Sequence, residues 1–93
     1  MYLVVISSRA RKSLRKYEHS GVFPRGKFRQ ALLHLRENGF LPVSYRDHQL
    51  HGELSTYREF HIASDVLVQY EHDEKLMVIT ITDVGTHTEF FGS

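Results

Sequence analysis

The feature that most constrains the fold is a change of hydrophobic period at Pro42. Before it, apolar side chains recur at helical spacing, most clearly between residues 28 and 35. After it, apolar and polar residues alternate as they do in a half-buried strand, for example over residues 59–62. One such change predicts an α+β fold, in which helices pack on one face of a mostly antiparallel sheet.

The part before Pro42 begins with a strand-like run, YLVVIS, followed by two serines that can cap a helix. The predicted first helix covers residues 9–20 and ends at Gly21. Pro24 suits the first turn of a second helix, which Gly39 ends. These two segments are expected to form a helical hairpin.

The part after Pro42 is expected to supply the rest of a four- to five-stranded sheet within one domain, residues 1–93. Residues 51–62 suggest a strand, a turn and a second strand, and ASD at 63–65 a tight turn. VLVQY suggests another strand, EHDEK a polar turn, and LMVITITDV a longer strand before a C-terminal tail. Strict alternation along that last strand places Asp83 in register with Ile79 and Ile81.

Charge is distributed unevenly along the chain. Residues 1–46 hold ten Lys or Arg and two acidic residues, whereas residues 47–93 hold two basic and nine acidic residues. This split suggests a basic surface for a polyanion or an acidic partner, and equally suits two solvated helices. The absence of cysteine excludes disulfides and thiolate metal sites, and no apolar run approaches a membrane span. MYLVVISS is too short for a secretory signal, so a cytoplasmic location is expected.

Histidines supply the candidate catalytic residues. His61 and Asp65 flank a turn, where a carboxylate can orient an imidazole and raise its pKa. His48 lies in a loop, and His87 follows the last strand. Each is also compatible with an ordinary surface histidine. His48 and His51 lie three residues apart, but this segment does not look helical and no zinc motif is present, so no metal site is expected.

Taken in order, these motifs resemble the YafQ branch of the RelE/ParE toxin superfamily. The resemblance covers residues 41–91 and joins a leucine-proline, an aspartate-histidine, an arginine-glutamate-x-histidine-isoleucine-x-x-aspartate segment and a glycine-threonine-histidine. The matching residues are Leu41, Pro42, Asp47, His48, Leu50, Gly52, Arg58, Glu59, His61, Ile62, Asp65, Gly85, Thr86, His87 and Phe91.

The resemblance implies the toxin of a type II toxin–antitoxin pair, a ribosome-dependent endoribonuclease that cleaves translated mRNA without a cofactor. It implies a cognate antitoxin as partner and ribosomal RNA contacts through the basic helices, with no membrane or DNA contact. The implied catalytic residues are His48, His61, Asp65 and His87, and the implied substrate-binding residues are Arg46, Arg58 and Phe91. His51 matches no position of the family pattern.

The chain departs from the family pattern at Asp83, where arginine is usual. A carboxylate there would repel a phosphate, so a second hypothesis is an attenuated homologue that binds an antitoxin but cuts poorly. Val66, Ser64 and Gln69 also replace the usual residues. A third hypothesis, a gyrase-directed poison, lacks support because such relatives do not carry this set of histidines.

Overall fold

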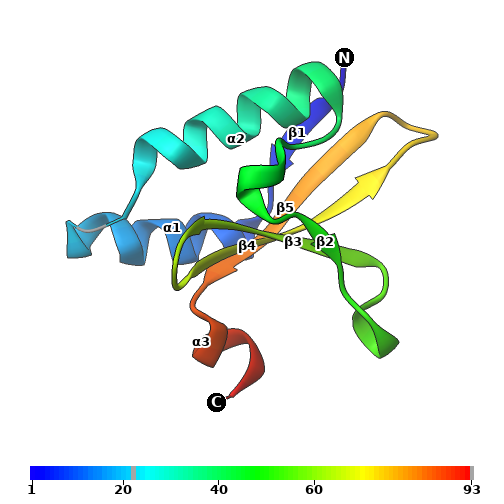
Figure 1. Ribbon diagram of the computed structural model, residues 1–93. Coiled ribbons are helices and arrows are strands. Elements are labelled where there is room, and N and C mark those ends of the chain that lie inside the picture. The colour runs from blue at the N-terminus through cyan, green and yellow to red at the C-terminus, as the bar shows by residue number, and fades with distance from the viewer. Residues whose placement is uncertain (22, 93) are drawn as a thin grey trace.

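The computed structural model describes residues 1–21 and 23–92. Both long helices precede Pro42 and four of the five strands follow it, as the change of period predicts, and the α+β class is confirmed (Figure 1). The helices and strands are β1 (Leu3–Ile6), α1 (Ser8–Ser20), α2 (Arg25–Asn38), β2 (His48–Gln49), β3 (Tyr57–Ala63), β4 (Val66–Asp73), β5 (Val78–Gly85) and α3 (His87–Phe91), with short 3-10 turns at Val43–Tyr45 and Gly52–Leu54. None of the helices in the described ranges is long and apolar enough to cross a membrane.

The five strands form one mixed sheet in the order β1-β5-β4-β3-β2. β1 pairs with β5 in parallel, and the other neighbours are antiparallel. The parallel pair arises because the helical hairpin carries the chain away from β1 before the meander of β2 to β5 begins. The first and last strands of the chain therefore lie side by side.

Local capping fixes both long helices. The Ser7 hydroxyl accepts a hydrogen bond from the Ala10 backbone N–H at the start of α1. Gly21 and Gly39 end the two helices in the left-handed conformation, with φ of 73° and 79°. A side chain at Gly39 would also collide with the Tyr2 ring, 2.3 Å from the position of its Cβ.

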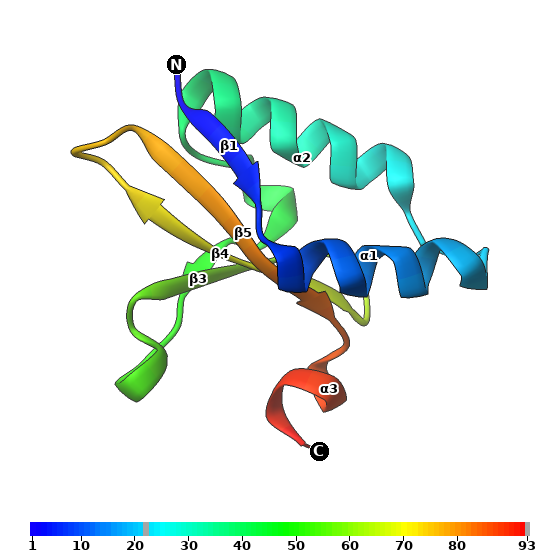
Figure 2. The ribbon, with the colours of Figure 1, turned by 180° about the vertical axis from the view of Figure 1, so that it is seen from behind.

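The two faces of the sheet have different neighbours. The inner face, which carries Phe60, Tyr70 and Ile81, packs against buried residues of α1 and α2 to form the core. The outer face carries Glu59 and His61, together with the residues that pair with them across the sheet. Figure 1 shows α2 and α3 on opposite sides of the sheet, and Figure 2 shows both long helices from behind.

Three predicted elements are wrong in extent. The first strand expected within residues 51–62 is absent, because that segment makes a 3-10 turn at Gly52–Leu54; the strand β2 precedes it, and His48, expected in a loop, begins this two-residue strand. β4 continues through the polar residues 71–73, so the turn to β5 comes later than expected. The tail contains a short helix, α3, which begins with a capping box between Thr86 and Glu89.

A β-bulge in β5 corrects the predicted direction of Asp83. Tyr70 pairs with Ile81, and the next residue back along β4, Gln69, pairs with Asp83, so Thr82 is the extra residue. The Thr82 hydroxyl donates a 3.0 Å hydrogen bond to the Gln69 carbonyl. Asp83 consequently lies on the outer face beside Gln69, whereas Ile81 points into the core.

Candidate active site

The outer face brings together two histidines and a glutamate from neighbouring strands. His48 of β2 pairs directly with Glu59 of β3, so their side chains lie on one face. Nε2 of His48 is 3.5 Å from Oε1 of Glu59. The rings of His48 and His61 are 6.3 Å apart, because alternation along β3 returns His61 to the same face two residues after Glu59.

Glu59 is the most buried member of this cluster, with 3% of its surface exposed. Burial raises the pKa of Glu59, while the positive charge available on His48 and His87 acts in the opposite direction. Its second oxygen, Oε2, is buried and has no hydrogen-bond partner among the described residues. A buried, unpaired carboxylate oxygen favours the protonated form of Glu59, in agreement with its raised pKa.

Arg46 orients both histidines. It occupies the left-handed region, with φ of 52°, at the end of the 3-10 turn before β2. Its guanidinium lies 3.1 Å from Nδ1 of His61, and since a guanidinium only donates, Nδ1 must be the acceptor. Its carbonyl lies 2.8 Å from Nδ1 of His48, which must therefore donate. Burial lowers the pKa of His61, and the charge of Arg46 lowers it further.

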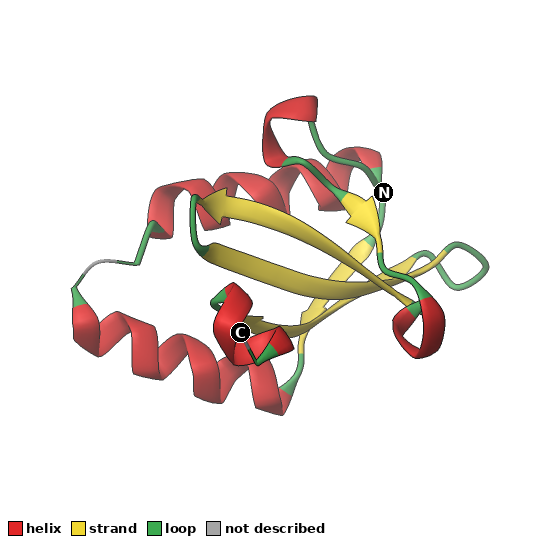
Figure 3. Cartoon of the chain, turned by 60° about the horizontal axis from the view of Figure 1, so that its bottom comes forward, coloured by secondary structure: helices red, strands yellow, loops and turns green. Residues whose placement is uncertain are grey.

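His87 approaches the cluster from the first turn of α3. Its backbone N–H donates to Oδ1 of Asp65 at 3.4 Å, across the turn between β3 and β4. Its ring packs on that of Phe91, with 4.8 Å between centroids. α3 can lie close to the sheet because Gly85 has no side chain, and a Cβ there would be 3.0 Å from the Phe90 ring. In Figure 3, α3 lies in front of the sheet.

Glu89 connects α3 to α1. It accepts hydrogen bonds from the Tyr17 hydroxyl and from the Thr86 backbone N–H, and Lys16 Nζ lies 2.9 Å from its other oxygen. The bond from Tyr17, followed by that from Lys16, lowers the pKa of Glu89 from 4.5 to about 2. The segment that carries His87 is therefore tied to both the sheet and a long helix.

The cluster also has the composition of a metal-binding site. His48, Glu59 and His61 each offer one ligand atom, and these atoms lie within 4.8 Å of one another. Imidazole nitrogen and carboxylate oxygen together suit zinc or copper among the divalent ions. This donor set differs from the His48–His51 pair weighed in the sequence, because His51 lies outside it.

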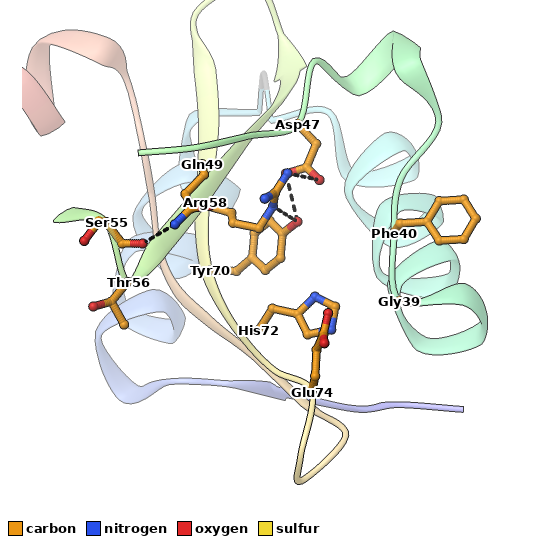
Figure 4. A pocket seen from close by; sticks show the side chains of 10 residues that line it. All are labelled: Gly39, Phe40, Asp47, Gln49, Ser55, Thr56, Arg58, Tyr70, His72 and Glu74. Atoms are coloured by element: carbon orange, nitrogen blue, oxygen red, sulfur yellow. Dashed lines mark hydrogen bonds and ion pairs between the residues drawn. The ribbon is translucent and has the colours of Figure 1, made fainter. Parts of the chain in front are cut away.

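Arg58 lies on the inner face, opposite the face that carries His48 and His61. Figure 4 shows it beside Asp47 and Tyr70. Its guanidinium bonds both oxygens of Asp47 at 3.3 Å and the Tyr70 hydroxyl at 3.3 Å, while that hydroxyl donates to Asp47 at 2.8 Å. Burial acts to lower the pKa of Arg58, but the bonds to Asp47 and Tyr70 outweigh it and raise the pKa. This network lines a cavity of about 380 Å³ beside Phe40 at the end of α2.

The predicted site residues thus separate into three groups. His48, His61 and Arg46 meet on the outer face, and Asp65, His87 and Phe91 meet at α3, with the charge of His87 acting on His61. Arg58 is apart from both. Glu59 was not among the predicted site residues, although alternation along the strand already placed its side chain on the same face as that of His61.

Comparisons with known proteins identify the family. A family model described as bacterial toxin of type II toxin–antitoxin system, YafQ, matches residues 2–92. The mRNA interferase toxin YafQ of Escherichia coli K12 is 38% identical over 52 residues, a match that covers 56% of this chain and 54% of that protein. The matched segment therefore spans about half the length of this curated relative.

Solved structures extend the likeness to the whole fold. A copper-bound mutant toxin from Helicobacter pylori has a TM-score of 0.88 and 26% identity, covering 98% of this chain and 100% of that one. The E. coli DinJ–YafQ complex gives a TM-score of 0.83 at 24% identity, covering 99% and 100%. The second likeness is one of fold.

Proposed function

The chain belongs to the YafQ family of bacterial toxins of type II toxin–antitoxin systems, and from this premise we propose that it is an endoribonuclease that cleaves mRNA on the ribosome. The observation that carries the proposal is the convergence of His48, Glu59 and His61 on the outer face, with His87 close enough to affect Glu59 electrostatically. The mRNA interferase name of the E. coli relative supports the same reaction.

The chemistry follows from these groups. RNA can cleave itself when its 2′-oxygen attacks the adjacent phosphorus, which forms a cyclic phosphate and releases the 5′-oxygen. Glu59 suits the removal of the 2′-hydroxyl proton, because the pKa of this carboxyl is raised and its Oε1 lies 3.5 Å from Nε2 of His48 within the cluster. His87 would return a proton to the departing 5′-oxygen, and His48 would offset charge on the phosphate.

Two further predicted residues take positioning roles in this scheme. Arg46 fixes the tautomer of His61, and Asp65 holds the backbone of His87. Asp65 would therefore act through His87 instead of exchanging protons with the RNA. Phe91, whose ring packs against that of His87, would meet a nucleobase.

The test is cleavage of mRNA in a reconstituted translation system, mapped by primer extension, with ribosome-free mRNA as a parallel arm. We expect cleavage by the wild type that depends on ribosomes, and a loss of about 100-fold or more for Glu59→Gln. His51→Ala is the matched control, because His51 is an exposed histidine outside the cluster. The absence of cleavage in both arms would refute the nuclease and favour the antitoxin-binding homologue.

An antitoxin is the partner that this family implies, and the E. coli DinJ–YafQ complex supports the same assignment. The ten basic residues before position 47 suit either an acidic antitoxin segment or ribosomal RNA. Co-expression with the neighbouring gene should give a complex that copurifies and no longer cleaves mRNA. Failure of every neighbouring product to copurify would count against this partner.

A further inference from the structure

We infer that Arg9 of α1, held by Asp83, binds a backbone phosphate of the RNA beside the histidine cluster. The inference rests on the proposed nuclease function and deepens it by assigning a phosphate-binding residue outside the sheet. If Arg9 binds the phosphate, it supplies the positive charge that the usual arginine at position 83 would have supplied.

Asp83 is fully engaged by its neighbours. Its side chain is 11% exposed, and Oδ1 accepts from the Ser13 hydroxyl and the Val84 backbone N–H, both at 2.8 Å. Oδ2 lies 3.0 Å from Nε of Arg9. The carboxylate therefore faces α1, and its charge is offset before any substrate arrives.

Arg9 is held by Asp83 but is largely exposed. Its Nε lies 3.0 Å from Oδ2 of Asp83, while 81% of its side chain is exposed. An exposed guanidinium has a planar set of donors that can engage two oxygens of a phosphate. A guanidinium already held by a carboxylate loses less conformational freedom when it binds such a ligand.

The space in front of Arg9 is hollow. A cavity of about 250 Å³ is lined by Arg9 and Asp83, with Tyr57 and Gln69 on the sheet and Phe91 on α3. Glu89 also borders it, but Lys16 and Tyr17 engage that carboxylate. Among the described residues that line this cavity, Arg9 is therefore the one with a positive charge that a phosphate could bind.

The cavity adjoins the reacting groups. Asp83 pairs with Gln69, and Gln69 pairs with Glu59, so two strand spacings, or about 10 Å, separate Asp83 from Glu59. On the other side, the Phe91 ring stacks on that of His87. Neighbouring nucleotides of one strand can therefore reach Arg9 and the cluster together, which places Arg9 on a phosphate next to the scissile one.

The experiment compares Arg9→Ala with Lys75→Ala, which removes the same charge from an exposed site in the β4–β5 turn. Single-turnover cleavage on programmed ribosomes gives the half-saturating protein concentration and the limiting rate. A short RNA with 2′-O-methyl groups, which cannot be cut, gives binding without chemistry. Thermal unfolding checks that each variant is folded.

For Arg9→Ala we expect the half-saturating concentration to rise about tenfold, which corresponds to about 1.4 kcal/mol, with little change in the limiting rate. The slope of log K against log salt should fall by about 0.7, as for one lost phosphate contact to a single strand. Arg9→Lys should be intermediate, because lysine lacks the planar pair of donors. Asp83→Asn should weaken binding less than Arg9→Ala, because Arg9 remains but is no longer held.

Equal behaviour of Arg9→Ala and Lys75→Ala in both assays would overturn the inference. If the wild type binds the methylated RNA but does not cleave, the nuclease proposal fails, and the binding arm alone decides the role of Arg9. If the wild type neither binds nor cleaves, both proposals fail.

Discussion

Two aspartate–arginine pairs lie on opposite faces of the same sheet and have different architectures. On the inner face, Arg58 uses both Nε and Nη2 on Asp47 and Tyr70, and its side chain is 34% exposed. On the outer face, Arg9 uses Nε on Asp83 and is 81% exposed. Both pairs join an arginine to an aspartate. The Arg58 guanidinium bonds two neighbouring side chains, whereas most of the Arg9 side chain is exposed to solvent.

An arginine–aspartate pair near a site therefore indicates a binding function only where part of the guanidinium is still exposed to a ligand. The inner pair ties the segment before β2 to the middle of the sheet, which favours stability. The outer pair presents a cation next to the histidine cluster. Substitutions on the two faces should therefore separate folding from cleavage, and the following predictions test this separation.

The largest expected effect is on cleavage, from His87→Ala on the outer side. Removing a group that donates a proton in the transition state should lower the rate by about 10²- to 10⁴-fold. The midpoint of thermal unfolding should stay unchanged, because the side chain is exposed. Single-turnover cleavage and calorimetry on the same preparation measure both. A cleavage rate within a few-fold of wild type would show that His87 does not take part in the reaction.

Next in size is Arg58→Ala on the inner face. The Tyr70 hydroxyl loses its donor and Asp47 loses its cation while keeping the bond from Tyr70, so the free energy of unfolding should fall by about 1–3 kcal/mol, measured by urea titration. Cleavage per folded molecule should be retained. The double variant Arg58→Ala/Asp47→Asn should cost less than the two single changes added together, because the residues share one network.

The opposite result for Arg58 would restore the sequence-based prediction. If Arg58→Ala unfolds like the wild type but loses cleavage, then Arg58 binds substrate and the division between the faces is wrong.

A smaller effect concerns pH and the tie between α1 and α3. The pKa of Glu89 is lowered from 4.5 to about 2, so its stabilising contribution is present above pH 4.5 and is lost as the pH falls toward 2. Glu89→Gln keeps a capping-box side chain but removes the charge. The variant should be less stable by about 0.2–1 kcal/mol at pH 6, because the pair is partly exposed.

The two unfolding midpoints should approach each other as the pH falls toward 2 and converge below it, where the wild-type carboxyl is protonated. A difference that persists unchanged to that pH would show that shape, and not charge, holds α3 on α1.

The smallest expected effect is that of His51→Ala. The residue is exposed and precedes the Gly52–Leu54 turn without a side-chain cap bond. The free energy of unfolding should change by less than about 0.5 kcal/mol, and cleavage should match wild type. A measurable loss of cleavage would show that His51 also belongs to the active site, together with His48, Glu59 and His61.

Local signals were sufficient to predict the two long helices, α1 and α2. Ser7, Gly21 and Gly39 mark their ends, and each acts through neighbours a few residues away in the chain. α3 was missed although Thr86 and Glu89 have the spacing of a capping box, a signal that the sequence does contain. Helices of this length are easily overlooked because little apolar periodicity fits within five residues.

The site was predictable only in part, because it depends on pairing between strands. His48, His61 and His87 follow from the family motifs, but the position of Glu59 opposite His48 requires the register of β2 on β3. The partner of Asp83 could not be predicted at all, since Arg9 is more than seventy residues away in the chain. Such contacts arise from tertiary packing and leave no periodic signal.

The single extra residue at Thr82 has a consequence for how this strand tolerates change. Upstream of it the odd-numbered positions face the core, as at Ile81, and downstream the even-numbered position Val84 does. Loss of Thr82 alone should therefore be tolerated better than loss of a residue from a strand without a bulge, because Ile81 and Asp83 would then follow each other in a regular ladder opposite Tyr70 and Gln69. Such a deletion keeps the carboxylate on the outer face and Val84 in the core, whereas a one-residue loss from a regular strand turns every following side chain to the other face.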